Sequence, residues 1–196
     1  LLSERIHPLP TPLREALIST FCPSPLQPLI SSSPRDRDCL LRIYLGKRDF
    51  SSTSTSFTLR NFGLRLERIE KLGLQDEAVK WAGGMGEALA ACHFAAEHEA
   101  GDVEFVLGSG ISPSGPTSSG NSGGTESQGE MALWLLDFNC SLPLPLTVGG
   151  MQEAARVHWL NDPYYPRPGP WRENQLEKKL WDAFEESYLV TGGRIL

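Results

Sequence analysis

The strongest constraint in this sequence is a helical repeat of apolar side chains over residues 76–99. These side chains recur at steps of three and four residues: Val79, Ala82, Met85, Leu89, Cys92 and Ala96. Such steps place them on one face of a helix. Asp76 and Glu77 suit the positive N-terminal end of that helix, and Gly101 can end it. The sequence therefore predicts a long amphipathic helix over residues 76–99.

Shorter elements surround this helix along the chain. Patterns typical of strands fill residues 39–46, 57–66, 102–107 and 132–139, and helical patterns fill residues 13–21, 67–72, 151–160 and 175–189. Seven of the 15 prolines lie in residues 1–34, which favours extended chain with one short helix capped by Thr11. We therefore predict a wrapping segment at residues 1–38 and one α+β domain at residues 39–196. A flexible insertion rich in Gly and Ser interrupts that domain at residues 108–130.

Length and composition limit the class of protein. The chain has 196 residues, of which 40% are hydrophobic and 21% charged, as in a globular domain. Its longest apolar run, residues 131–136, falls far short of the roughly 20 residues of a membrane span, so we expect no membrane partner. The four cysteines lie far apart without a Cys-x-x-Cys pair, which excludes a disulfide framework and a structural zinc site. We expect no bound metal and a cytoplasmic location.

The charge is distributed unevenly. A formal net charge of −6 argues against a broadly basic nucleic-acid binder, and we expect no DNA partner. Residues 1–75 nevertheless carry 11 Lys+Arg against 7 Asp+Glu, which leaves the acidic excess in the rest of the chain. The basic side chains predicted to face RNA phosphates are Arg42, Lys47, Arg48 and Arg60. The alternative is scattered, solvated charge.

The order of elements resembles the lower lobe of protein kinases and aminoglycoside phosphotransferases. A long helix, a short strand, a connection and an apolar strand ending in Asp137-Phe138 follow one another as they do there. We therefore predict an α+β, protein-kinase-like lower lobe whose N-terminal lobe is reduced or absent. The kinase catalytic loop, the glycine-rich loop and the phosphate-binding lysine are missing, so an active phosphotransferase is disfavoured.

Three carboxylates near strand ends are the acid–base candidates. If the two strands pair, Asp102, Glu104 and Asp137 meet at one edge, where they could bind a cation or act as a base. The alternative for Asp102 and Glu104 is a solvated turn. Asp137 follows a run that looks buried on both faces, so its charge would need a partner or a function.

Histidine and cysteine give weaker signals. His93 shares the apolar face of the long helix, which favours a hydrogen-bonded core histidine over a catalytic base. His98 follows five residues later, which is the wrong spacing for a helical zinc pair. Cys92 and Cys140 could act as nucleophiles, but buried structural cysteine is the commoner role.

A stiff aromatic loop over residues 161–170 is the main surface candidate. Prolines fix the loop, and it could present flat stacking faces to a base, a peptide or a guanidinium group. The residues predicted to bind substrate there are Asp162, Tyr164, Tyr165 and Arg167. The alternative is that the two tyrosines pin the loop onto the last helix.

Six ordered motifs together resemble a fungal domain of unknown function that carries the misleading label zinc-finger-protein-like. They occupy residues 38–48, 59–62, 85–90, 102–108, 133–139 and 161–166. The resemblance spans residues 5–196, and no cysteine/histidine finger pattern accompanies it. Members of that domain family resemble fungal arginine-containing cyclodipeptide synthases, which join arginine to a second amino acid drawn from aminoacyl-tRNA.

The resemblance implies a specific chemistry. An aminoacyl ester is already activated, so no cofactor is expected, and the partners would be arginyl-tRNA and a second aminoacyl-tRNA. Asp102, Glu104 and Asp137 could supply the general base and a guanidinium clamp, with Asn139 as an amide donor. A covalent route would use Cys140 instead. The alternative is a catalytically inert, kinase-like protein-interaction domain; the second amino acid and the oligomeric state stay open.

Overall fold

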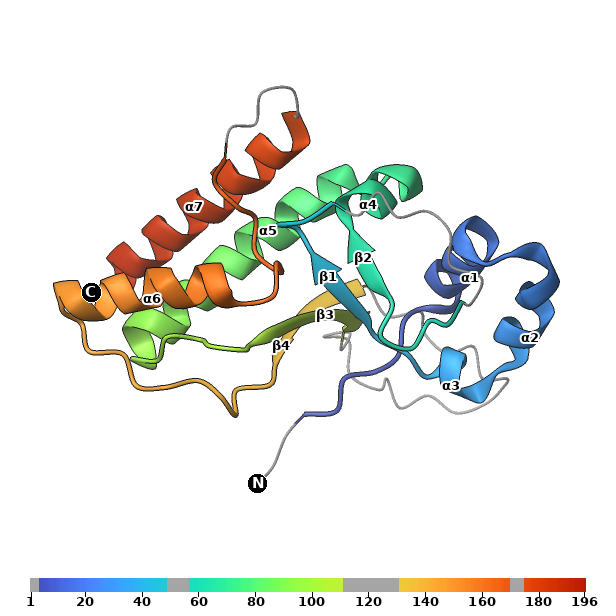
Figure 1. Cartoon of the computed structure of the whole chain (residues 1–196), viewed down its shortest axis with the longest axis horizontal. Helices are drawn as coiled ribbons and strands as arrows, with labels where there is room; N and C mark the ends of the chain where they lie inside the picture. Colours follow the sequence, from blue (N-terminus) through green and yellow to red (C-terminus); the bar gives the residue numbers. More distant parts are fainter. Residues whose placement is uncertain (1–3, 49–56, 111–130, 170–174) are drawn as a thin grey trace, which may run out of the picture. The chain divides into compact units, whose positions relative to one another are not determined.

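The computed structural model describes residues 4–48, 57–110, 131–169 and 175–196 (Figure 1). Its helical elements are α1 (Thr11–Phe21), η1 (Ser24–Leu26), α2 (Gln27–Ser32), α3 (Pro34–Arg37), α4 (Leu66–Leu72), α5 (Gln75–Ala90), η2 (Ala91–Ala95), α6 (Val148–Leu160) and α7 (Gln175–Ile195). Its strands are β1 (Leu41–Tyr44), β2 (Gly63–Arg65), β3 (Glu104–Ser109) and β4 (Met131–Leu136). Most of the predicted insertion lies outside the described residues.

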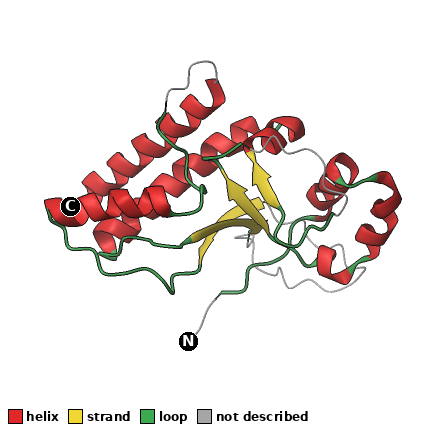
Figure 2. Ribbon diagram, in the orientation of Figure 1, coloured by secondary structure: helices red, strands yellow, loops and turns green. Residues whose placement is uncertain are grey.

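The four strands form one sheet in the order β2-β1-β3-β4 (Figure 2). β1 and β2 run parallel, with Ile43 opposite Leu64 at the centre of their register. Both of these side chains are fully buried. The predicted α+β class is therefore confirmed. Within the described residues, no helix combines the length and the apolar character needed to cross a membrane.

The chain divides into two compact units. The first comprises Leu1–Leu41, Ser54–Phe62 and Leu107–Trp134, and the second comprises Arg42–Thr53, Gly63–Val106 and Leu135–Leu196. Each unit is therefore built from segments that are distant in the sequence. The division at residue 38 stays a prediction.

The first unit corrects the expectation of an extended proline-rich segment. Besides α1, residues 24–37 form three short helical elements, and each of the four elements carries a proline at its first or second position. Proline is favoured there because the first N–H groups of a helix have no partner within it, so the N–H that proline lacks is not missed. The prolines thus start helices in this segment, and Thr11 lies inside α1, whose cap position is Pro10.

A buried carboxylate fixes the end of this helical segment. Asp36 accepts hydrogen bonds from the hydroxyl of Thr58 at 2.7 Å and from the N–H of Leu59 at 2.6 Å. The Asp36 N–H donates in turn to the hydroxyl of Ser33 at 3.3 Å. Burial opposes the charge, but these hydrogen bonds keep the pKa of Asp36 below its ordinary value. Asp36 therefore joins α3 to residues 58–59 within the first unit.

The second unit is organised by the packing of α5 on α7. A Cβ atom at Gly86 would lie only 2.3 Å from the carbonyl oxygen of Phe184, so the two backbones approach closely there. The buried face of α5 includes Met85 and Leu89, as the helical period predicts. The helix ends earlier than predicted, because it passes into the π-helical turn η2 and Glu97 then adopts left-handed backbone with φ 52°.

We expect Gly86→Ala to lower the free energy of unfolding by about 2 kcal/mol, since the added methyl group would force the two helices apart. Gly193→Ala is the matched control in α7, because a Cβ there would meet no atom within 4 Å. That control should be neutral or stabilising by up to about 1 kcal/mol, as alanine favours helix over glycine. Urea unfolding measures both. Equal effects of the two substitutions would contradict the close packing.

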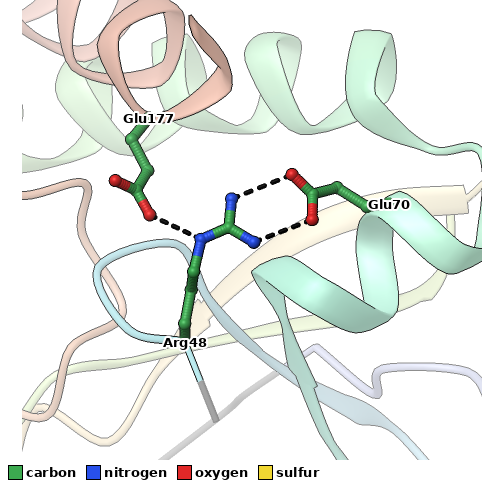
Figure 3. A network of polar contacts seen from close by, with 3 residues as sticks. All are labelled: Arg48, Glu70 and Glu177. Atoms are coloured by element: carbon green, nitrogen blue, oxygen red, sulfur yellow. Dashed lines mark hydrogen bonds and ion pairs between the residues drawn. The ribbon is translucent and has the colours of Figure 1, made fainter. Parts of the chain in front are cut away.

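Arg48 ties three parts of the second unit together (Figure 3). Its terminal nitrogens donate to both carboxylate oxygens of Glu70 in α4 at 2.7 and 2.8 Å. Its Nε donates to Glu177 in α7 at 2.7 Å. The hydrogen bonds to Glu70 and Glu177 raise the pKa of Arg48 and outweigh its partial burial, and the hydrogen bonds from Arg48 lower the pKa of Glu70. A bidentate pair of this kind is stronger than a single surface ion pair.

The lowered pKa of Glu70 predicts how stability depends on pH. The stabilising contribution of Glu70 should be complete above its ordinary pKa of about 4.3 and lost as pH falls through its lower pKa in the folded state. Glu70→Gln should therefore cost about 1 kcal/mol at neutral pH and flatten the acid limb of the stability curve. Urea unfolding across acid pH measures this. Glu153→Gln breaks an exposed pair with Arg156 and is the control; an equal response of both variants would contradict the prediction.

Candidate functional site

Two loops of the second unit lie along each other and form the candidate site. They are residues 97–102, which precede β3, and residues 137–144, which follow β4; together we call them the acidic loop pair. An antiparallel bridge joins His98 to Pro143, and the Glu99 N–H donates to the carbonyl of Leu142 at 3.1 Å. The buried Glu99 carboxylate accepts a hydrogen bond from the Leu142 N–H. Glu99 therefore satisfies both the carbonyl and the N–H of Leu142.

The acidic loop pair concentrates backbone strain. Among the described residues, five that are not glycine have positive φ, and four of them lie in this loop pair: Glu97, Ala100, Asp102 and Asp137. Left-handed backbone at such residues costs on the order of 1 kcal/mol each and persists only where the surroundings enforce it. Strain of this kind gathers at functional sites. The two exposed carboxylates of Asp102 and Asp137 are thus both held in unfavourable backbone.

Asn161, at the end of α6, fixes the turn that carries Asp102. Its side-chain oxygen accepts from the Asp102 N–H at 2.9 Å, and its side-chain nitrogen donates to the carbonyl of Ala100 at 2.9 Å. Arg167 donates to the carbonyl of Asn161 at 3.0 Å and also to the carbonyl of His158. Arg167 therefore caps α6 and holds Asn161 in place.

The sequence did not point to a role for Asn161, although Asn161 is the first residue of the motif at residues 161–166. Asparagine commonly bonds to backbone close by in the sequence, and that habit makes it recognisable in turns. Here its partners lie about sixty residues earlier. Nothing in the local sequence could have shown that contact.

The charges of both Asp102 and Asp137 act on Cys140. Slight desolvation, the charge and hydrogen bond of Asp102, and the charge of Asp137 all raise the pKa of the exposed Cys140 thiol. A raised pKa keeps the thiol protonated, so this environment does not activate Cys140 as a nucleophile. The site offers two carboxylates beside a neutral thiol.

The expectation that the run before Asp137 is buried on both faces is wrong. β4 ends at Leu136, all six of its residues are only half-buried, and Asp137 is exposed. Asn139 is likewise exposed, in the turn that follows. The apolar run looked like a strand covered on both faces, but neither face of β4 is fully covered.

Glu104 does not join these carboxylates. It lies at the start of β3 and pairs with Arg42 of β1 at 2.8 Å. Of the side chains predicted to face phosphates, Arg42 is thus engaged by Glu104, and Arg48 by Glu70 and Glu177. Lys47 is exposed, and Arg60 is exposed in the other compact unit.

The aromatic loop is an internal anchor. Tyr164 and Tyr165 are only 2% and 1% exposed, so the expectation that they present surface stacking faces is wrong. Tyr164 stacks on Tyr44 with ring centroids 4.8 Å apart, and Tyr165 packs against Phe184 of α7 at 5.6 Å. The alternative, that the tyrosines pin the loop onto the last helix, is correct for Tyr165. Asp162 is exposed at the start of this loop.

His93 and two of the four cysteines lie in the core. His93 is a buried histidine whose Nδ1 lies 2.9 Å from the hydroxyl of Tyr188, as expected for a hydrogen-bonded core residue. Across the described parts of the chain, no three His, Cys, Asp or Glu side chains gather in a way that could hold a metal ion. Cys22 and Cys39 are buried, and burial is the main cause that raises the pKa of each.

Comparison with known proteins gives one match. Residues 133–196 match the domain family DUF3669, which is described as "Zinc finger protein". This range holds β4, the second loop of the acidic loop pair, α6 and α7, so the predicted domain of unknown function is confirmed there. Neither a curated protein nor a solved structure matches the chain.

The zinc-finger description does not fit the residues of the matched range. A structural zinc site takes four Cys or His ligands. Residues 133–196 contain one cysteine, Cys140, and one histidine, His158. The match is therefore a similarity to this family over residues 133–196, and these residues lack the four ligands of a structural zinc site.

We expect Asn161→Ala to loosen the acidic loop pair, because it removes two hydrogen bonds from the strained turn at residues 100–102. The free energy of unfolding should fall by about 1–3 kcal/mol. Amide hydrogen exchange of peptides covering residues 97–104 should rise at least about tenfold, which corresponds to roughly 1.4 kcal/mol of local opening. Asn139→Ala, at an exposed position of the same site, is the control. Unchanged exchange in Asn161→Ala would contradict the role of Asn161.

Proposed function

We propose that this chain is an aminoacyl-tRNA-dependent cyclodipeptide synthase that joins arginine to a second amino acid. The observation that carries the proposal is the pair of exposed carboxylates, Asp102 and Asp137, which are both in left-handed backbone and whose charges both act on Cys140. The six motifs also support it, because they resemble a domain family whose members resemble arginine-containing cyclodipeptide synthases.

A pair of carboxylates suits a guanidinium substrate. The arginine side chain is a planar cation with several N–H donors, and carboxylates bind it with two parallel hydrogen bonds. Strained backbone held by Asn161 keeps at least one carboxylate oriented before the substrate arrives. Such preorganisation lowers the cost of binding. In this proposal one carboxylate binds the guanidinium group of the arginyl ester.

The second carboxylate would act on the amine. In each of two aminolysis steps, an α-amine attacks the carbonyl carbon of an aminoacyl ester, a C–N bond forms, and the ribose hydroxyl leaves with a proton. The attacking nitrogen must lose its extra protons, which calls for a general base. Asp102 is the base in this scheme, because Asn161 fixes its turn, and Asp137 then clamps the guanidinium group.

Other parts of the proposal follow from the same chemistry. The exposed amide of Asn139 could donate to the oxyanion that forms in each step. Lys47 and Arg60 are exposed cations suited to tRNA phosphates. An ester substrate needs no nucleotide, so a kinase-like lower lobe without the phosphate-binding parts is compatible with this activity and belongs to the proposal.

Expression of the chain in a bacterial host followed by untargeted mass spectrometry tests the activity without a guessed partner amino acid. We expect new cyclic dipeptides that contain arginine. Asp137→Asn and Asp102→Asn should each lower their yield at least about 100-fold, the usual contribution of a general base or a charged substrate contact. Asp182→Asn removes an exposed pair with Lys178 within α7, outside the acidic loop pair, and is the matched control. Unchanged host metabolites with a folded, soluble protein would contradict the proposal.

A second candidate function is a catalytically inert protein-interaction domain. It is favoured by exposed apolar side chains on α6 and on the last turns of α7: Val148, Trp159, Leu160, Leu189, Val190 and Ile195. This candidate predicts that protein copurifies with the chain and that tRNA does not. Nuclease-sensitive ultraviolet absorbance in the purified sample would contradict it and favour the synthase.

A further inference from the structure

An aromatic cavity of about 320 Å³ lies between α5, η2, α6 and α7 in the second unit. Its lining includes four aromatic rings and two imidazoles: Trp159, Trp181, Phe184, Tyr188, His93 and His158. None of these residues belongs to the acidic loop pair. The volume is at the lower end of the range for small-molecule sites, about 300–1,000 Å³, and suits a ligand with one or two rings.

Two ring nitrogens of residues that line this cavity lack a partner. His93 Nε2 and His158 Nε2 are both buried, and neither has a hydrogen-bond partner among the described residues. A buried polar nitrogen without a partner costs roughly 1–3 kcal/mol, so such atoms usually mark a missing partner. His93 pairs with the hydroxyl of Tyr188 through Nδ1 at 2.9 Å, which leaves its Nε2 as the unpartnered atom of that ring. A hydroxyl group on a bound ring could donate to His158 Nε2 or accept from it.

The charged side chain on the wall of the cavity is acidic. Glu185 is the one charged side chain among the described residues that line it, and it is exposed at the rim. Burial lowers the pKa of His158 to about 4 and lowers that of His93, so both imidazoles are neutral at neutral pH. The guanidinium group of Arg167 donates to the carbonyls of His158 and Asn161 and lies over the ring of Trp159.

We propose that this cavity binds a hydroxylated aromatic amine, whose ring packs among the aromatic side chains, whose hydroxyl pairs with His158 Nε2 and whose ammonium group faces Glu185. Offset or edge-on ring contacts are favourable beyond simple burial, and the ring faces also attract the cation. A ligand with a carboxylate in place of the ammonium group would be repelled by the Glu185 carboxylate. The proposal does not depend on the reaction proposed above.

Three small probes separate the contributions to binding. Tyramine carries the ring, the hydroxyl and the ammonium group; phenethylamine lacks the hydroxyl; 4-hydroxyphenylacetate replaces the ammonium group by a carboxylate. Ligand-observed NMR and calorimetry on the full chain measure the affinity of each. We expect saturable binding of tyramine, at least about threefold weaker binding of phenethylamine, and at least about threefold weaker binding of 4-hydroxyphenylacetate.

Variants then assign the contacts. Trp181→Ala should weaken tyramine binding at least about tenfold, since it removes a ring that lines the cavity. Glu185→Gln should abolish the preference for tyramine over 4-hydroxyphenylacetate, whereas Glu186→Gln, its exposed neighbour outside the cavity, should keep that preference. Circular dichroism checks that each variant is folded.

The outcomes that overturn the proposal are also distinct. These are no saturable tyramine binding by the folded wild-type chain, equal affinity for tyramine and 4-hydroxyphenylacetate, or full binding by a folded Trp181→Ala variant. None of these results would bear on the proposed synthase activity, because the variants change no residue of the acidic loop pair. Loss of the synthase activity would leave the binding result equally intact.

Discussion

The close approach of α5 and α7 is the constraint on which the second unit depends. Gly86 leaves no room for a side chain against the carbonyl of Phe184, and a Cβ atom at Gly192 would lie 2.7 Å from the ring of Phe94. These contacts hold η2 against α7 and set where the chain leaves the helix. The first loop of the acidic loop pair begins at that point, and the aromatic cavity is lined by the same two helices.

A relay of hydrogen bonds connects this framework to the carboxylates. Arg167 caps α6 and holds Asn161, and Asn161 holds the backbone on either side of Gly101. The relay offsets the cost of left-handed backbone at Ala100 and Asp102. A loop without it would relax, and its carboxylate would lose a fixed position. Asp102 is exposed, so the hydrogen bond between its backbone and Asn161, and not burial of its side chain, fixes its position.

Periodic patterns in the sequence predicted the long helices, but they could not predict contacts between residues that are distant in the sequence. The helices at residues 151–160 and 175–189 correspond to α6 and α7, because each buries one regular face. The burial of residues 133–136 on both faces and the surface position of Tyr164 were predicted wrongly, since each depends on which distant segment covers a strand or a loop. The role of Asn161 depends on partners that are distant in the sequence and left no local signal.

Purified chain incubated with arginyl-tRNA that carries radiolabelled arginine, together with a pool of other aminoacyl-tRNAs, tests the central claim most directly. The synthase account predicts that label leaves the tRNA as a cyclic dipeptide, which resists aminopeptidase digestion because it has no free α-amine. Label that stays on tRNA, or that is released only as free arginine at the rate without protein, would contradict the account.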